Sequence, residues 1–220
     1  EEGRRIYDNI RKSIQFLLAS NMSEVASIFL ATLLGIRLLE PVHLLWINLI
    51  TDCFPALALG MERAEPGSMH RLPRPRGQGI FAGGLGVDVL WQGALVTALT
   101  LGSYFAGVRL ETGLWQADQS GLGVTMAFLT MSMAEIFHSF NLRSRRGSIF
   151  EQQGENPYLW AALAGSLALT TGVLFFPPAA AAFGFAPLSM AQYGLSLALA
   201  LAVIPAVELV KWMLGGEKQG

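Results

Sequence analysis

Six long apolar stretches dominate this 220-residue sequence. Each is close to the roughly 20 residues that an α-helix needs to cross the hydrocarbon core of a bilayer. Charged residues make up 14% of the chain, against about 25% in soluble domains, which places it in the membrane class. We therefore expect an all-α, polytopic membrane protein: a six-helix transmembrane bundle forming a single domain over residues 1–220. The expected spans are about 13–36, 42–60, 80–108, 124–141, 157–177 and 190–214.

The distribution of basic residues predicts the orientation of these spans. Six crossings put both termini on one side, and of the fifteen Lys and Arg residues only Arg37 and Arg109 fall on the other. By the positive-inside rule, the termini and the loops at 61–79 and 142–156 are cytoplasmic. The net charge of −1 gives no reason to expect binding to nucleic acid.

Polar side chains interrupt three of the apolar stretches. In ASNMSEVAS, Asn21 and Glu24 are three residues apart, and in WINLITDCF the polar residues stand at i, i+3 and i+4, so each set shares a helix face. Each acidic residue at the centre of a membrane helix costs about 2.5–3.5 kcal/mol, so three of them indicate a function. All the side chains offer oxygen, which suits a hard cation. The predicted metal ligands are Asn21, Glu24, Asn48, Thr51, Asp52 and Glu135.

An alternative for the acidic residues remains open, namely that they are protonated carboxyls that hold helices together. Pro55 favours the cation site, because it has no N–H and should leave the carbonyl of Thr51 without its helical partner. Irregular backbone at membrane depth is tolerated where it lines a protein cavity. Cys53 and His138 lie off the polar faces and are not favoured as ligands.

Two further patterns concern packing. Gly83, Gly86 and Gly93 predict a small-residue face on the third span, suited to close helix contact. Glu208 and Lys211 are spaced for an ion pair along the last helix, and Pro205 is expected to kink that helix.

The segments ASNMSEV and LLWINLITDCFPALALGME resemble the fifth and sixth transmembrane helices of P-type (E1–E2) calcium-transporting ATPases of the sarcoplasmic/endoplasmic reticulum pump type. GRRIYDNIRK is similar to the stalk that precedes them, and EPGSMHRLPRP to the loop that follows. The fourth span, with Glu135, resembles the eighth helix of the family. The resemblance covers nearly the whole chain, is sharp over 3–76 and loose over the last two spans, and implies helices five to ten of such a pump.

The resemblance also implies roles for the polar residues. Asn21, Glu24, Thr51, Asp52 and Glu135 match the first calcium site of the family, and Asn48 with the shared Asp52 matches the second. Because close relatives that carry one ion lack the acid at the position of Glu24, its presence favours two sites. Clustered carboxylates cannot all stay ionised without a cation, so in the intact pump we expect Glu24, Glu135 and Asp52 to take up protons when Ca²⁺ leaves, which gives proton countertransport.

Several parts of such a pump are missing from this sequence. It has no DKTGT-like phosphorylation motif, no nucleotide-binding domain and no PEGL-type segment, so we predict no catalytic or cofactor-binding residue. Mg²⁺ and ATP would act only in the intact parent, together with the N-terminal helices and cytoplasmic domains. Leu72 departs from the proline-rich loop pattern of the family. The single cysteine and compact loops indicate a bacterial pump in the plasma membrane. The rival hypotheses are a free-standing secondary transporter or channel, and an inert membrane scaffold.

Overall fold

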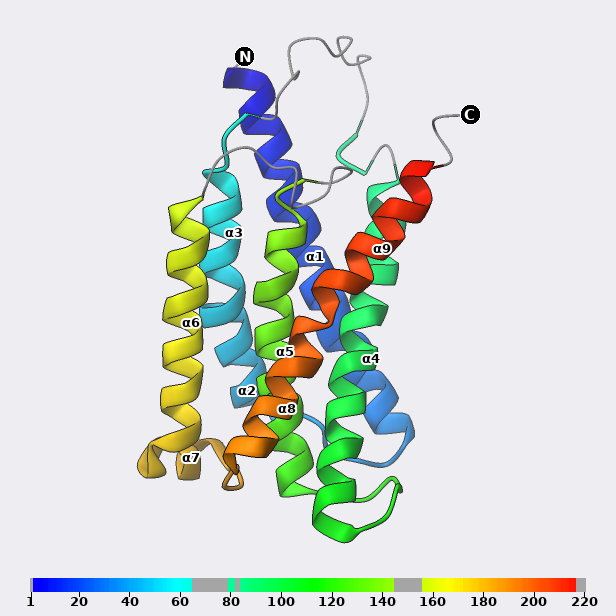
Figure 1. Ribbon diagram of the computed structural model, residues 1–220, viewed down its shortest axis with the longest axis vertical. Helices are drawn as coiled ribbons and strands as arrows, with labels where there is room; N and C mark the ends of the chain where they lie inside the picture. The colour runs from blue at the N-terminus through cyan, green and yellow to red at the C-terminus, as the bar shows by residue number, and fades with distance from the viewer. Residues whose placement is uncertain (1, 65–78, 82–83, 145–155, 217–220) are drawn as a thin grey trace.

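The computed structural model describes residues 2–64, 79–81, 84–144 and 156–216, and these residues form helices and connecting turns without any strand. Figure 1 shows the long helices side by side, with the start of α1 and the end of α9 at the same end of the bundle, called the terminal end below. The all-α class is confirmed. The elements are α1 (Glu2–Leu33), α2 (Pro41–Trp46), η1 (Ile47–Asp52), α3 (Cys53–Gly60), α4 (Leu85–Thr112), α5 (Gly121–Asn141), α6 (Pro157–Phe175), α7 (Pro177–Phe183), α8 (Met190–Leu201) and α9 (Val203–Gly216).

Most of the predicted spans are long and apolar helical segments. Within the described residues, five segments have the length and composition needed to cross a membrane. The segment from α2 to α3 counts as one of these, and α8 with α9 as another. The structure is therefore an all-α membrane bundle. The five segments are Glu2–Leu33, Pro41–Gly60, Leu85–Thr112, Pro157–Phe175 and Met190–Met213.

The fourth predicted span is not among these five segments, and it lies inside the bundle. The helix α5 lies where it was expected, and its 21 residues extend about 30 Å. It contacts α1, α3, η1, α4, α6, α8 and α9, so most of its side chains face protein. A helix surrounded by other helices can carry more polar residues than one that faces lipid. Its polar side chains, Glu135 and His138 among them, are consequently surrounded by protein.

Several predicted boundaries are corrected. The third helix begins at Leu85 rather than near residue 80, following Gly84 in a left-handed conformation. The last span is broken at Ala202 between α8 and α9. The break follows Leu201, whose carbonyl would normally accept a hydrogen bond from the N–H of residue 205. Pro205 has no N–H, so the expected kink is present. The predicted ion pair between Lys211 and Glu208 is confirmed at 2.8 Å.

Glycine allows α4 to approach its neighbours closely. A Cβ added at Gly93 would lie 2.8 Å from the Met22 side chain of α1, so that part of the predicted small-residue face is confirmed. Gly86 faces open space, and Gly83 lies outside the described residues. Near the opposite end of the bundle, a Cβ at Gly107 would lie 2.6 Å from the Cα of Gly123 on α5. The backbones of α4 and α5 therefore touch at Gly107.

Replacing Gly107 with alanine is expected to destabilise the bundle by about 1–3 kcal/mol, because the backbone of α5 must move to admit the methyl group. The measurement is thermal unfolding of the purified chain in detergent. Gly102→Ala is the matched control, since Gly102 lies on the same helix with nothing within 4 Å of the added atom. The control should be neutral or slightly stabilising, because alanine is the better helix former. Equal behaviour of the two variants would contradict the close contact.

Candidate functional site

A π-helical turn interrupts the second span at the residues predicted to bind a cation. The turn η1 contains Asn48, Thr51 and Asp52, and regular helix resumes at Cys53. In a π-helix the carbonyl of residue i pairs with the N–H of residue i+5, and such turns occur frequently at functional sites. For Ile50 that partner would be Pro55, which has no N–H. The Ser166 hydroxyl of α6 instead donates to the Ile50 carbonyl at 3.0 Å. The predicted irregular backbone is therefore present in η1. The carbonyl affected is that of Ile50, one residue before the Thr51 carbonyl indicated by the sequence.

Asp52 and Glu135 form the buried centre of the candidate site. Their side chains come from η1 and α5 and are 1% exposed. They are close enough to repel each other when both are ionised. The Ser20 hydroxyl of α1 donates to Asp52 Oδ1 at 3.0 Å, and the Ser23 hydroxyl lies 3.1 Å from Glu135 Oε1. Three helices thus meet at two carboxyls.

Glu24 completes the acidic cluster from α1. It is buried, and the Asn48 amide donates to its two carboxyl oxygens at 2.7 and 3.0 Å. The same amide group also donates to the Leu44 carbonyl at 2.9 Å. Glu24 is close enough to Asp52 and Glu135 for the three groups to repel one another when ionised. A cation placed among them would relieve that repulsion.

Two predicted ligands lie apart from this arrangement. Asn21 is exposed, and its amide donates to the Leu17 carbonyl of the same helix at 2.7 Å rather than to a member of the cluster. Thr51 is buried in η1, but its hydroxyl donates to the Ile47 carbonyl at 2.9 Å. Cys53, which was not favoured as a ligand, is exposed. The structure therefore brings together Glu24, Asn48, Asp52 and Glu135 of the six.

One oxygen of Asp52 and one of Glu135 are available to a cation, but the cluster does not hold enough ligands to bind one in its present arrangement. Asp52 Oδ2 and Glu135 Oε2 are buried and have no hydrogen-bond partner among the described residues. However, within the described part of the chain no three Asp, Glu, His or Cys side chains converge closely enough to hold one metal ion. Amide, hydroxyl or carbonyl oxygens would have to complete the coordination, as a hard cation with six or more oxygen ligands requires.

The sequence analysis missed the hydroxyl groups that orient the carboxyls. Ser20 and Ser23 bond to Asp52 and Glu135, as described above, and Ser27 continues the same buried face of α1. The spacing of these three serines, at i, i+3 and i+7, is the signal that could have identified that face.

A second buried polar cluster lies at the terminal end. Glu62, which follows α3, accepts from Arg143 at 2.9 and 3.2 Å and from the Asn156 amide at 2.8 Å. The Asn9 amide of α1 donates to the Glu62 carbonyl at 2.6 Å. The cluster therefore connects α1, α3, α5 and α6 at one point, and it fixes the terminal end of the helix that carries η1.

Comparison with known proteins identifies the family. The model for the family described as "Cation transporting ATPase, C-terminus" matches residues 37–213, most of the chain. The chain belongs to this family. It corresponds to the C-terminal membrane region of a P-type cation-transporting ATPase, which confirms the resemblance noted in the sequence.

The relatives agree with this assignment. The chain is 38% identical over 223 residues to calcium-transporting ATPase 1 of Bacillus cereus, a match that covers 96% of the chain and 25% of that protein. It is 34% identical to the calcium-transporting ATPase of Bacillus subtilis, covering 99% of the chain and 24% of that protein. A calcium-transporting ATPase of Plasmodium falciparum is 29% identical over 96% of the chain. The chain spans about a quarter of the length of the bacterial relatives.

Proposed function

We propose that this chain forms the ion-binding membrane part of an ATP-driven calcium pump. One observation carries the proposal: Glu24, Asp52 and Glu135, from three different elements, are buried side by side in the middle of the bundle. Carboxylates in that position are unfavourable unless a cation or protons balance their charge. The calcium-transporting relatives support Ca²⁺ as the transported cation.

The proposed ligands remain the six residues of the sequence analysis, and their present positions indicate how they would have to move. Asn48 now directs its amide nitrogen at Glu24, so it would have to rotate to offer its oxygen to an ion between them. Thr51 would have to exchange its bond to the Ile47 carbonyl for the ion. Asn21 faces the exposed side of α1, where the remainder of the pump could complete the coordination.

Protons are proposed to replace calcium in the second half of the cycle. When Ca²⁺ leaves, Glu24, Glu135 and Asp52 would take up protons, because three clustered carboxylates repel one another in a buried setting. Calcium export would then be coupled to proton import.

The remaining three quarters of the parent protein would supply the other functions. Phosphorylation by ATP with Mg²⁺ and the helices that close the site would belong to the part of the parent that this chain does not cover, since the chain spans about a quarter of its bacterial relatives. The bundle is proposed to lie in a bacterial plasma membrane with its terminal end in the cytoplasm, because nearly all the basic residues fall on that side.

The test is ATP-driven accumulation of ⁴⁵Ca²⁺ by vesicles that contain the complete pump. Glu24→Gln and Glu135→Gln should each abolish accumulation, since each removes a carboxylate ligand. Asp118→Asn, which changes an exposed acidic residue in the connection before α5, should retain it. Transport by both cluster variants would contradict the proposal. Calcium flux through vesicles that contain the 220-residue chain alone, without ATP, would instead favour a secondary transporter or channel.

A further inference from the structure

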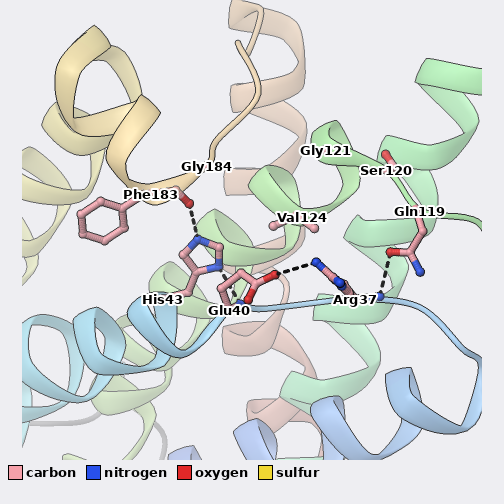
Figure 2. A pocket seen from close by; sticks show the side chains of 9 residues that line it. All are labelled: Arg37, Glu40, His43, Gln119, Ser120, Gly121, Val124, Phe183 and Gly184. Carbon is pink, nitrogen blue, oxygen red and sulfur yellow. Dashed lines mark hydrogen bonds and ion pairs between the residues drawn. The ribbon is translucent and has the colours of Figure 1, made fainter.

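His43 lies near the start of α2, at the end of the bundle opposite the termini. Its side chain is only 1% exposed, yet it borders a hollow of about 290 Å³. Figure 2 shows that three connections meet there: the one before α2, the one before α5 and the one after α7. The lining residues are Arg37, Glu40, His43, Gln119, Ser120, Gly121, Val124, Phe183 and Gly184.

Both ring nitrogens of His43 are occupied, and their partners determine the protonation state. The backbone N–H of Glu40 donates to Nδ1 at 3.0 Å, so Nδ1 carries no hydrogen. Nε2 lies 2.8 Å from the Phe183 carbonyl, which can only accept, so Nε2 carries the hydrogen. Only the neutral imidazole with its hydrogen on Nε2 satisfies both bonds.

The ring also packs against aromatic side chains of other elements. It stacks on Phe185, with centroids 4.7 Å apart and planes at 16°, and it lies 5.4 Å from Phe128 of α5. Together with the bond to Phe183, these contacts attach the first turn of α2 to α5 and to the connection between α7 and α8. The next residue, Leu44, accepts from the Asn48 amide, which leads directly to η1.

The helix that carries the candidate ligands is therefore attached at its two ends. Glu62 and its partners fix the terminal end, and His43 fixes the other. The π-helical turn η1, where regular hydrogen bonding is interrupted, lies between these attachments. A change in the contacts of His43 can therefore reach η1 through the first turn of α2.

The polar groups that line the hollow mostly bond to one another. The Gln119 amide is already bonded to the Arg37 N–H and to the Gly35 carbonyl. The charged groups that face His43 are Glu40 and Arg37, which lie 3.8 Å from each other, and the side chains that α5 and the α7–α8 connection pack on the ring are apolar. No other titratable side chain lines the hollow among the described residues.

We propose that His43 is a positioning residue that holds η1 in place, and that its protonation from the end of the bundle opposite the termini releases η1. A protonated ring would direct an Nδ1–H at the Glu40 N–H, so that two donors face each other and the bond is lost. The ring contacts with Phe128 and Phe185 would not replace the lost hydrogen bond, because aromatic rings offer no acceptor for the Nδ1–H in the direction of Glu40. The proposal rests on the proposed function only in treating η1 as the segment that carries ligands.

The test uses a nitroxide spin label on Cys53, the single cysteine of the chain, which is exposed and immediately follows η1. Label mobility is recorded for the 220-residue chain in detergent without calcium, from about pH 8 to about pH 5, the range in which histidine changes charge. Acidification should raise the ratio of mobile to immobile label roughly tenfold, the effect of losing one buried hydrogen bond. Because calcium is absent, failure of the calcium site would leave this result unchanged.

Three variants decide whether His43 is responsible. In His43→Gln the amide can still reach the Phe183 carbonyl but cannot titrate, so the response to acid should fall several-fold, to the part that protonation of the cluster carboxyls causes. Asp52→Asn with His43 retained should keep most of the native response, because it removes the carboxyl next to the label. His138→Gln, which replaces a buried histidine of α5 that contacts Gln92, should respond like the native chain. An acid response as large in His43→Gln as in the native chain, or a native chain whose label does not respond, would overturn the proposal. ¹⁵N NMR of the histidines provides an independent test, because a protonated Nδ1 on His43 at neutral pH would also overturn it.

Discussion

Replacing Asp52 with asparagine in the complete pump is expected to lower its apparent calcium affinity by more than about a hundredfold. Substitution of groups that merely support a metal ligand already lowers affinity by about 10–100-fold, and Asp52 is proposed to be a ligand itself. Asparagine has nearly the same size and can still accept the 3.0 Å bond from Ser20, so the fold should survive. The negative charge beside Glu24 and Glu135 would be lost.

The measurement is the calcium dependence of phosphorylation by ATP, which reports ion binding through its effect on the rest of the pump. Asp88→Asn is the matched control, because Asp88 also lies on a membrane helix but belongs to the first turn of α4, outside the cluster. The control should show native calcium dependence. If Asp52→Asn also showed native dependence, Asp52 could not be a ligand of the transported ion.

Replacing Arg143 with methionine is expected to destabilise the bundle by about 3–5 kcal/mol, the effect of removing one partner of a buried ion pair. The side chains of Arg143 and Glu62 are 12% and 5% exposed, and two hydrogen bonds join them. Without the guanidinium, Glu62 would remain buried with only the Asn156 amide bound to its carboxylate. Unfolding of the purified chain in detergent measures the effect.

Two controls separate burial from charge. Arg37→Met removes an ion pair whose side chains are 81% and 50% exposed, so it should change stability by less than about 1 kcal/mol. The double variant Arg143→Met with Glu62→Leu should recover much of the loss, because no unpaired charge remains. Similar stabilities for Arg143→Met and Arg37→Met would show that the terminal-end cluster contributes little.

Local sequence patterns predicted much of this fold because their causes are local. The ion pair between Glu208 and Lys211 and the kink associated with Pro205 both follow from spacing within one helix. The acidic residues of the site stand out in the sequence because apolar neighbours surround them. Glu24, Asp52 and Glu135 were identified in this way.

The remaining features depend on contacts between distant segments. Residues three apart on a helix differ by about 60° in direction, which is enough to place Glu24 inside the cluster and Asn21 outside it. Pro55 indicated irregular backbone, but the position of the π-helical turn also depends on a donor from Ser166, more than a hundred residues later. The role of His43 likewise depends on Phe183, on a different helix.

The most direct test of the calcium site is the position of the bound ion. Anomalous diffraction from crystals of the complete pump grown with calcium should place an ion between α1, η1 and α5. Oxygens of Glu24, Asp52 and Glu135 should border it at about 2.3–2.6 Å. A saturated calcium position elsewhere in the membrane region, with these three carboxyls still bonded to Asn48, Ser20 and Ser23 as they are here, would contradict the proposed site.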